Sequence, residues 1–305
     1  MADEQDSGYG RGKSGAKGEV AAPDLPYQPR DPESYRPAIG LIGCGGISEM
    51  HLRAYKNAGY EVAALCSRDR ARAEGRRDEY YPEADIYLDY RDLLARDDIE
   101  VVDITPHPEE RVPILAAAID AEKHILSQKP FIVDLDVGEA LVARADARGV
   151  KMAVNQNGRW APHFSYMRQA VAAGLVGKVQ SVQFAVHWDH NWIAGSAFDE
   201  VEDLVLYDFG VHWFDMVLAL LRDEKPQKVY ASARRSAGQG AKPPLLAHAP
   251  STRGRAGASR AKTLDRRPSP HRAWLWRCSG RPPPRRAASP RACPQPSSYV
   301  PSSGR

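Results

Sequence analysis

A regular alternation of short β-branched runs and helical segments between residues 36 and 155 constrains the fold of this chain more than any other feature. The pattern predicts strands at 38–43, 61–66, 86–88, 100–105, 124–127 and 150–154, with helices at 47–58, 69–79, 90–96, 109–121 and 136–148. Strands and helices that alternate at this spacing form a doubly wound parallel sheet of the α/β class. All strand carboxyl ends then lie at one edge, where such folds bind ligands.

The pattern changes after residue 155. Helices are expected at 163–173 and 204–222, and strands at 178–188, which alternates with a period of two, and at 229–233. We interpret residues 156–236 as the beginning of a second, α+β domain with too few strands for a complete sheet.

The two ends of the chain differ from its body. Residues 1–35 are rich in Gly, Pro, Asp, Ser and Lys without apolar periodicity, which predicts a disordered segment. Residues 237–305 are expected to be a disordered tail rich in Arg and Pro. Residues 236–305 carry 12 Arg and 2 Lys against one acid, so their net charge is +13, whereas the rest of the chain carries −10. Either a frameshift near residues 236–250 or a genuine basic tail explains this composition.

Several classes of protein fit the sequence poorly. The sequence contains no run of 18 or more apolar residues, so we expect no membrane span. The N-terminus has no apolar stretch typical of a secretory signal. The four cysteines show no CxxC spacing, so we expect a reducing, cytoplasmic setting. The basic tail has few aromatics for base stacking, and we expect no nucleic-acid partner.

A glycine-rich loop follows the first predicted strand. Its sequence is Gly43-Cys44-Gly45-Gly46-Ile47-Ser48, which matches G-x-G-x-x-G/A with Ser48 in the last small position. Gly43 allows a tight turn, Gly45 permits close approach of a pyrophosphate, and the helix amino terminus offers free N–H groups. Because the motif lies between a strand and a helix, we expect residues 36–155 to be a dinucleotide-binding Rossmann domain and these six residues to contact the coenzyme.

The end of the second strand bears on the choice of coenzyme. An acid there would bind the ribose hydroxyls of NAD, but Ser67 occupies that position and Arg68 follows. Loss of the acid and gain of an arginine favour NADP. The alternative is that Arg68 is a solvated charge and Asp69 binds the ribose of NAD.

Further motifs appear in order along the chain. They are Thr105-Pro106, Ser127-Gln128-Lys129-Pro130, Asn155–Arg159, Gly174–Gly177 and Asp208-Phe209-Gly210-Val211-His212-Trp213-Phe214-Asp215. Together with the glycine loop, they make residues 37–236 resemble the glucose-fructose oxidoreductase and inositol dehydrogenase (Gfo/Idh/MocA) family.

The resemblance implies a Rossmann domain followed by a domain with a large open antiparallel sheet. It also implies hydride transfer between a nicotinamide and a carbinol or ketone of a sugar, cyclitol or related small polar molecule. By resemblance, Lys129, Asp208 and His212 are active-site residues. The family motifs further place Thr105, Pro106 and Gln128 at the coenzyme and Arg159 at the substrate.

The side chains themselves suit this chemistry. Oxidation of an alcohol needs a base for the hydroxyl proton and a cation for the developing alkoxide. His212 titrates near neutrality and suits the proton transfer. Lys129 follows a parallel strand and can polarise the substrate oxygen, while Asp208, four residues before His212 on a helix, can orient either group. The alternative is that all three are ordinary structural residues.

A polar and aromatic stretch, residues 187–192, lies at the end of the predicted strand 178–188. We expect Trp188 and His190 to line the substrate pocket, with a packed strand-to-loop corner as the alternative. A metal site built from His187, Asp189, Asp208 and His212 matches no standard spacing, and we expect none.

Two residues depart from the family pattern. Gln128 stands where Glu is more frequent, and Glu110 stands where His is common. The incomplete second domain also leaves turnover and the family's typical homo-oligomer in doubt. The alternative function is a dinucleotide-binding or sensor protein without catalysis.

Overall fold

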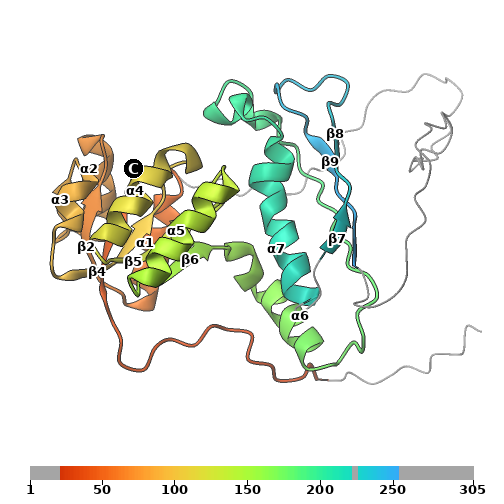
Figure 1. The fold of residues 1–305 in the computed structure, drawn as a ribbon, viewed down its shortest axis with the longest axis horizontal. Coiled ribbons are helices and arrows are strands. Elements are labelled where there is room, and N and C mark those ends of the chain that lie inside the picture. Colours follow the sequence, from red (N-terminus) through yellow and green to blue (C-terminus); the bar gives the residue numbers. More distant parts are fainter. Residues whose placement is uncertain (1–20, 222–225, 254–305) are drawn as a thin grey trace, which may run out of the picture. The chain divides into compact units, whose positions relative to one another are not determined.

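A computed structural model describes residues 21–221 and 226–253 of this chain. Its main feature is a six-stranded parallel sheet in the order β3-β2-β1-β4-β5-β6 (Figure 1). The strands are β1 (Ala38–Ile42), β2 (Val62–Cys66), β3 (Asp85–Tyr87), β4 (Ile99–Ile104), β5 (His124–Gln128) and β6 (Met152–Asn155). This order is that of a dinucleotide-binding Rossmann fold, which confirms the predicted fold class.

Helices connect successive strands of this sheet. They are α1 (Ser48–Ala58), α2 (Arg70–Tyr80), α3 (Tyr90–Leu94), α4 (Pro108–Asp120) and α5 (Leu135–Ala147). The bounds lie within two residues of the predicted ones. Asp69, Asp89 and Asp134 cap the starts of α2, α3 and α5 by accepting backbone N–H bonds, which explains why these helices begin where they do.

Two hydrophobic clusters hold the helices to the sheet. Leu41 of β1 and Leu65 of β2 pack with Leu52 of α1 in one cluster. The neighbouring strand residues, such as Ile42 and Cys66, belong to the other cluster with α3, α4 and α5. Because adjacent strand residues point to opposite faces, the sheet is covered on both sides.

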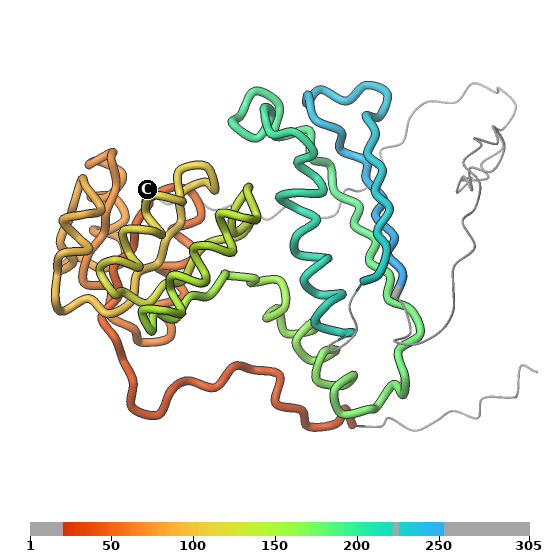
Figure 2. The backbone as a smooth tube through the Cα atoms, viewed as in Figure 1, coloured from red at the N-terminus to blue at the C-terminus, as the bar shows by residue number. Residues whose placement is uncertain are grey.

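The second part of the described chain differs from the prediction. Residues 178–188 form no strand and follow a long irregular path between α6 (Pro162–Ala172) and α7 (Gly210–Leu221) (Figure 2). Short 3-10 helices lie on either side of α6, namely η1 (Asn157–Trp160), η2 (Asn191–Ile193) and η3 (Ala197–Glu200). The helix predicted to begin at 204 instead begins as the π-helix η4 (Val205–Phe209), which continues as α7.

Short strands beyond α7 also correct the predicted bounds. The strand expected at 229–233 is divided into β7 (Pro226–Val229) and β8 (Ser232–Arg234). β7 pairs antiparallel with β10 (Ser251–Arg253), and β8 pairs antiparallel with β9 (Leu246–His248). β9 and β10 lie in the region expected to be a disordered tail, so the boundary at residue 236 is too early. The remainder of that tail lies outside the described residues.

The amino-terminal segment has contacts that its composition did not predict. Residues 1–20 lie outside the described part, and residues 21–35 contain no helix or strand. Nevertheless, the carbonyl of Tyr27 accepts a hydrogen bond from Ser165, and the carbonyl of Pro23 accepts one from Tyr166 at 2.8 Å. The Tyr27 and Tyr166 rings meet edge-on at 5.9 Å, so this segment packs on α6. Among the described residues, no helix is long and apolar enough to cross a membrane.

Candidate functional site

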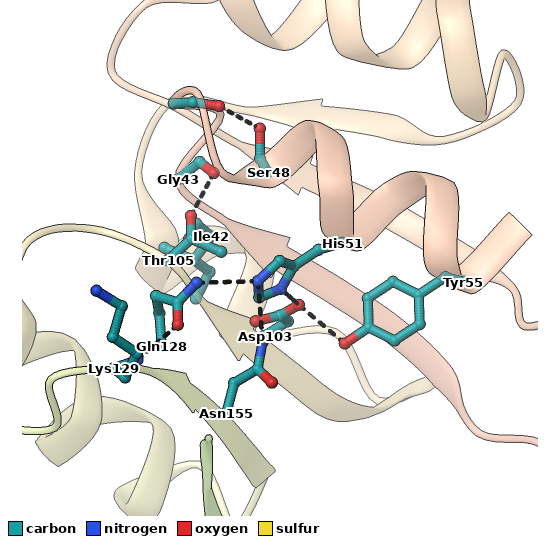
Figure 3. A network of polar contacts seen from close by, with 11 residues as sticks. Ile42, Gly43, Ser48, His51, Tyr55, Asp103, Thr105, Gln128, Lys129 and Asn155 are labelled. Atoms are coloured by element: carbon teal, nitrogen blue, oxygen red, sulfur yellow. Dashed lines mark hydrogen bonds and ion pairs between the residues drawn. The ribbon is translucent and has the colours of Figure 1, made fainter. Parts of the chain in front are cut away.

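The glycine loop lies at the carboxyl end of β1, and local packing fixes its shape. Gly43 has a φ of +103°, and a Cβ there would lie 2.6 Å from Thr105 Oγ1, so only glycine fits. The hydroxyl of Thr105 donates to the carbonyl of Gly43 at 2.6 Å (Figure 3). Ser48 is fully buried and donates to the carbonyl of Gly45 at 2.6 Å. Thr105 and Ser48 therefore hold the loop from both ends.

The loop leaves room for a dinucleotide. A Cβ on Gly45 or Gly46 would meet no atom within 4 Å. No side chain caps the start of α1 among the described residues. The N–H groups of Ser48 and Met50 donate to the carbonyls of Gly45 and Ile47, so phosphate oxygens would bind the other N–H groups of this first turn. A cavity of about 380 Å³ lies beside the loop, lined by Cys44, Gly45, Gly46, Arg72, Gly75, Arg76 and Glu79. This loop therefore fits a pyrophosphate.

Cys44 contributes its backbone rather than its thiol to this loop. Its side chain is 5% exposed, packs in the cluster beneath α1, and donates weakly to the carbonyl of Cys66 at 3.7 Å. Burial raises the pKa of the Cys44 thiol to about 11. The thiol therefore stays protonated at neutral pH.

The residues after β2 occupy the side of the site where a ribose would lie. Ser67 accepts the N–H of Asp69, and the carboxylate of Asp69 pairs with Arg72 at 3.1 Å. Arg68 is largely exposed and pairs with Glu110 at 2.7 Å. Glu110, whose role was unclear from the sequence, thus neutralises Arg68 in this structure.

Lys129 and Asp208, both expected in the active site by resemblance, form an ion pair in the structure. Lys129 follows β5, and its Nζ lies 3.1 Å from Asp208 Oδ2 and donates to the Asp208 carbonyl, also at 3.1 Å. Both side chains are largely buried, with exposed fractions of 17% and 12%. Asp208 lies in the π-helix η4, and such local widenings of a helix are frequent at functional sites.

His212 lies one turn after Asp208, close to the same charges. Burial and the charge of Lys129 lower its pKa from the ordinary value of 6.5, and Asp208 and Asp215 partly oppose this shift. Its Nδ1 is buried without a hydrogen-bond partner among the described residues, and it lies against Gly158. The imidazole is therefore neutral at neutral pH and has an unused ring nitrogen.

The residues predicted to bind substrate do not all lie beside Lys129, Asp208 and His212. Arg159 pairs with Asp215 through both carboxylate oxygens, one of them at 2.7 Å. The His190 ring contacts the ring of Phe209, the residue after Asp208, at a tilt of 51° with the ring centres 4.2 Å apart. Trp188 lies 4.9 Å from His190, with 68% of its surface exposed. Thus His190 contacts the residue that follows Asp208, whereas Arg159 has a carboxylate partner of its own.

Arg111 was not anticipated as part of the site. It is 1% exposed, and its guanidinium donates to the carbonyls of Pro106, Gln128, Pro130 and Phe131. Burial lowers its pKa to about 10. Arg111 therefore connects two segments: the turn that contains Lys129, and the loop that follows β4. In the sequence, this role could have been suspected only from a single arginine on the apolar side of the predicted helix 109–121.

A second group missed from the sequence lies beneath α1. His51, Tyr55, Asp103, Gln128 and Asn155 form a chain of side-chain hydrogen bonds, called here the His51 network (Figure 3). Asp103 is fully buried, so an acid within the apolar run 100–105 was its only signal in the sequence.

Comparisons with known proteins agree with this geometry. Residues 38–156 match the family described as an oxidoreductase family with an NAD-binding Rossmann fold, and residues 164–276 match the GFO/IDH/MocA C-terminal domain. The second match extends past residue 236, where the tail was expected to begin.

Relatives and solved structures point to the same family. Inositol 2-dehydrogenase of Salmonella paratyphi B is 29% identical over 195 residues, which are 63% of this chain and 56% of the relative. D-apiose dehydrogenase of Paraburkholderia graminis is 28% identical over 185 residues, or 60% of this chain and 49% of the relative.

The fold resembles that of scyllo-inositol dehydrogenase from Lactobacillus casei with bound NAD(H) and scyllo-inositol. The TM-score is 0.62 at 18% identity, covering 72% of this chain and 66% of that one. The chain spans about half the length of the curated relatives named above. It belongs to the GFO/IDH/MocA family of oxidoreductases, whose N-terminal domain is an NAD-binding Rossmann fold.

Proposed function

We propose that this chain is an NAD(P)-dependent oxidoreductase that acts on a CH–OH group of a sugar, cyclitol or related polyol. The observation that carries the proposal is the Lys129–Asp208 pair beside a neutral His212, at the sheet edge that also carries the glycine loop. The curated relatives include an inositol dehydrogenase and an apiose dehydrogenase, which supports a polyhydroxylated substrate.

Lys129 would polarise the substrate oxygen. Its ammonium has three N–H donors, and two of them bond to Asp208. No other acceptor lies within hydrogen-bond distance of Nζ among the described residues, so the third donor remains for a substrate oxygen. Asp208 keeps this ammonium in place and offsets its charge until an alkoxide develops.

His212 would accept the hydroxyl proton. A neutral imidazole has one nitrogen that can act as a base, and the lowered pKa of His212 keeps it in that form at neutral pH. The bound nicotinamide would take the hydride. His190, Trp188 and Arg159 are proposed to contact the rest of the polyol, with the Trp188 face against its C–H surface.

Activity of the full chain tests this proposal directly. Reduction of NAD⁺ and NADP⁺ is followed at saturating coenzyme with a panel of cyclitols and sugars. His212→Asn is expected to lower kcat about 100-fold or more without changing coenzyme affinity. His163→Asn, at an exposed position on α6, is the matched control. Coenzyme binding with no hydride transfer to any member of the panel would favour the sensor alternative.

We further propose a preference for NADP. Ser67 provides no carboxylate at the end of β2, and the carboxylate of Asp69 is occupied by the start of α2 and by Arg72. Arg68 is free to turn toward a phosphate because its exposed pair with Glu110 contributes only about 0–1 kcal/mol. The L. casei neighbour contains NAD(H), so this preference is where the present chain would differ.

Coenzyme titration separates the two possibilities. Arg68→Ala is expected to weaken NADPH binding about tenfold while NADH binding changes little. Ser67→Asp should favour NADH. Arg70→Ala removes an equal charge two residues further along the chain, at the start of α2, and serves as the control. Equal weakening of both coenzymes by Arg68→Ala, or tighter binding of NADH by the wild type, would contradict the preference.

A further inference from the structure

His51 lies at the centre of a buried network that connects α1 with the turn carrying Lys129. Its Nδ1 is 2.6 Å from Asp103 Oδ2 on β4. Its Nε2 is 3.2 Å from Gln128 Nε2 at the end of β5 and 3.1 Å from Asn155 Nδ2 at the end of β6. His51 is 7% exposed and Asp103 is fully buried (Figure 3). The function proposed above does not use this histidine.

The direction of each hydrogen bond in the network follows from one backbone group. The N–H of Lys129 can only donate, and it donates to Gln128 Oε1 at 2.6 Å. This bond fixes the orientation of the Gln128 amide, so its NH₂ group faces His51. The Nε2 of His51 must then be an acceptor without a proton. Its Nδ1 therefore carries the proton and donates it to Asp103.

The remaining group in the network supports this direction. The hydroxyl of Tyr55 donates to the same oxygen of Asp103 at 2.8 Å. Burial, followed by the charge of Asp103, raises the pKa of Tyr55 strongly, so the phenol stays protonated. Asp103 therefore accepts two hydrogen bonds, while the two amides of Gln128 and Asn155 leave no acceptor for a proton on Nε2.

We propose that His51 is a positioning residue for Lys129, held neutral with its proton on Nδ1 by the amide of Gln128, and that the side chain at position 128 sets its protonation. The proposal rests on the role of Lys129 in the proposed function. His51 fixes the Gln128 amide, and that amide in turn holds the backbone of Lys129. Because His51 lies on α1, the same helix that begins at the glycine loop also secures the Lys129 turn.

A carboxylate at position 128 would favour the protonated form of His51 instead of the neutral one. Gln128→Glu keeps an oxygen for the Lys129 N–H but presents a second oxygen to His51 Nε2. The imidazole then lies between two carboxylates, those of Asp103 and residue 128, with the amide of Asn155 and the phenol of Tyr55 as the other neighbours. We expect it to take up a second proton and become imidazolium.

Nitrogen NMR of the full chain labelled with ¹⁵N-histidine tests the protonation state without any need for turnover. The signals of His51 are identified by their loss in His51→Gln. At pH 7 the wild type is expected to show a protonated, pyrrole-like Nδ1 and an unprotonated, pyridine-like Nε2. In Gln128→Glu both nitrogens should become protonated, whereas Gln128→Leu should not protonate Nε2.

Two results would overturn the proposal. One is a protonated Nε2 in the wild type at pH 7, and the other is an unchanged His51 spectrum in Gln128→Glu. If residue 128 had only a structural role, the protonation of His51 Nε2 would not differ between the Glu and Leu variants.

Kinetics of the same variants tests the positioning role. Gln128→Leu is expected to lower kcat about tenfold or more, since small displacements of a reacting group are costly. Gln128→Glu should have a higher kcat than Gln128→Leu, because glutamate again provides an acceptor for the Lys129 N–H. Equal kcat in wild type and Gln128→Leu would contradict the positioning role. If the wild type oxidises no polyol, the proposed function fails, while the NMR result still decides the state of His51.

Discussion

Replacement of Arg111 by methionine measures how strongly the Lys129 turn is fastened. The guanidinium donates to four carbonyl oxygens and is 1% exposed, so the variant leaves these oxygens without a donor. Hydrogen bonds to a charged donor contribute about 1.5 kcal/mol each at the lower end of their range, which gives about 6 kcal/mol for four. The cost of burying the arginine opposes this contribution.

The cost of burial follows from the pKa of Arg111, which burial lowers to about 10. A shift of this size corresponds to about 3 kcal/mol that the variant recovers. The net expectation for Arg111→Met is thus a loss of about 3 kcal/mol in the free energy of unfolding, which is large for a single substitution.

Urea unfolding of the full chain, followed by far-ultraviolet circular dichroism, measures this difference. Arg144→Met is the control, because Arg144 pairs with Asp120 at the surface and should contribute less than about 1 kcal/mol. If Arg111→Met changes the stability no more than Arg144→Met does, the four bonds do not hold the turn and the reasoning is wrong.

Three further predictions concern the loop, the base and the thiols. Gly45→Asp should abolish coenzyme binding in a fluorescence titration while leaving the circular dichroism spectrum unchanged, because it places an anion where phosphates would lie. The NMR titration midpoint of His212 should lie below 6.5 and should rise in Lys129→Met, since the charge of Lys129 lowers the pKa of His212; an unchanged midpoint would show that the two groups do not interact. Cys44 and Cys66 should resist alkylation at pH 7.5 in the folded chain and react after unfolding, because burial raises both thiol pKa values, to about 11 and about 12; mass spectrometry of the alkylated chain checks this.

The Rossmann part of the fold was predictable because its signals are local. Most strands are short apolar runs, and three of the five helices begin after a capping aspartate, namely Asp69, Asp89 or Asp134. The glycine loop was predictable for the same reason, since Gly43 is required by its own backbone conformation. A parallel doubly wound sheet follows from such elements with few alternatives.

The second part was less predictable because strands need partners. Residues 178–188 alternate in the manner of a strand, yet they form no strand in the structure. In contrast, Leu246–His248 has little of the expected pattern and becomes a strand by pairing with Ser232–Arg234. Pairing of this kind depends on tertiary context more than on propensity.

The contacts of the candidate site divide in a similar way. Lys129 and Asp208 are 79 residues apart, and only their family motifs indicated that they belong to one site. His51 and Asp103 are 52 residues apart and carried no motif that was recognised. A buried acid in an apolar strand nevertheless requires a partner, so Asp103 could have been flagged from the sequence as a residue awaiting a donor.

Helix α1 contacts both the glycine loop and the residues that support Lys129, so its position affects coenzyme binding and the proposed catalysis together. Its first residue, Ser48, is fully buried and bonds to the glycine loop, and one turn later His51 faces the sheet and reaches Gln128. Any change that shifts α1 along its axis would therefore move both the phosphate-binding N–H groups and the support of Lys129. Coenzyme affinity and turnover should consequently fall together in variants that displace the helix, whereas His51→Gln should affect mainly turnover because it leaves the first turn in place.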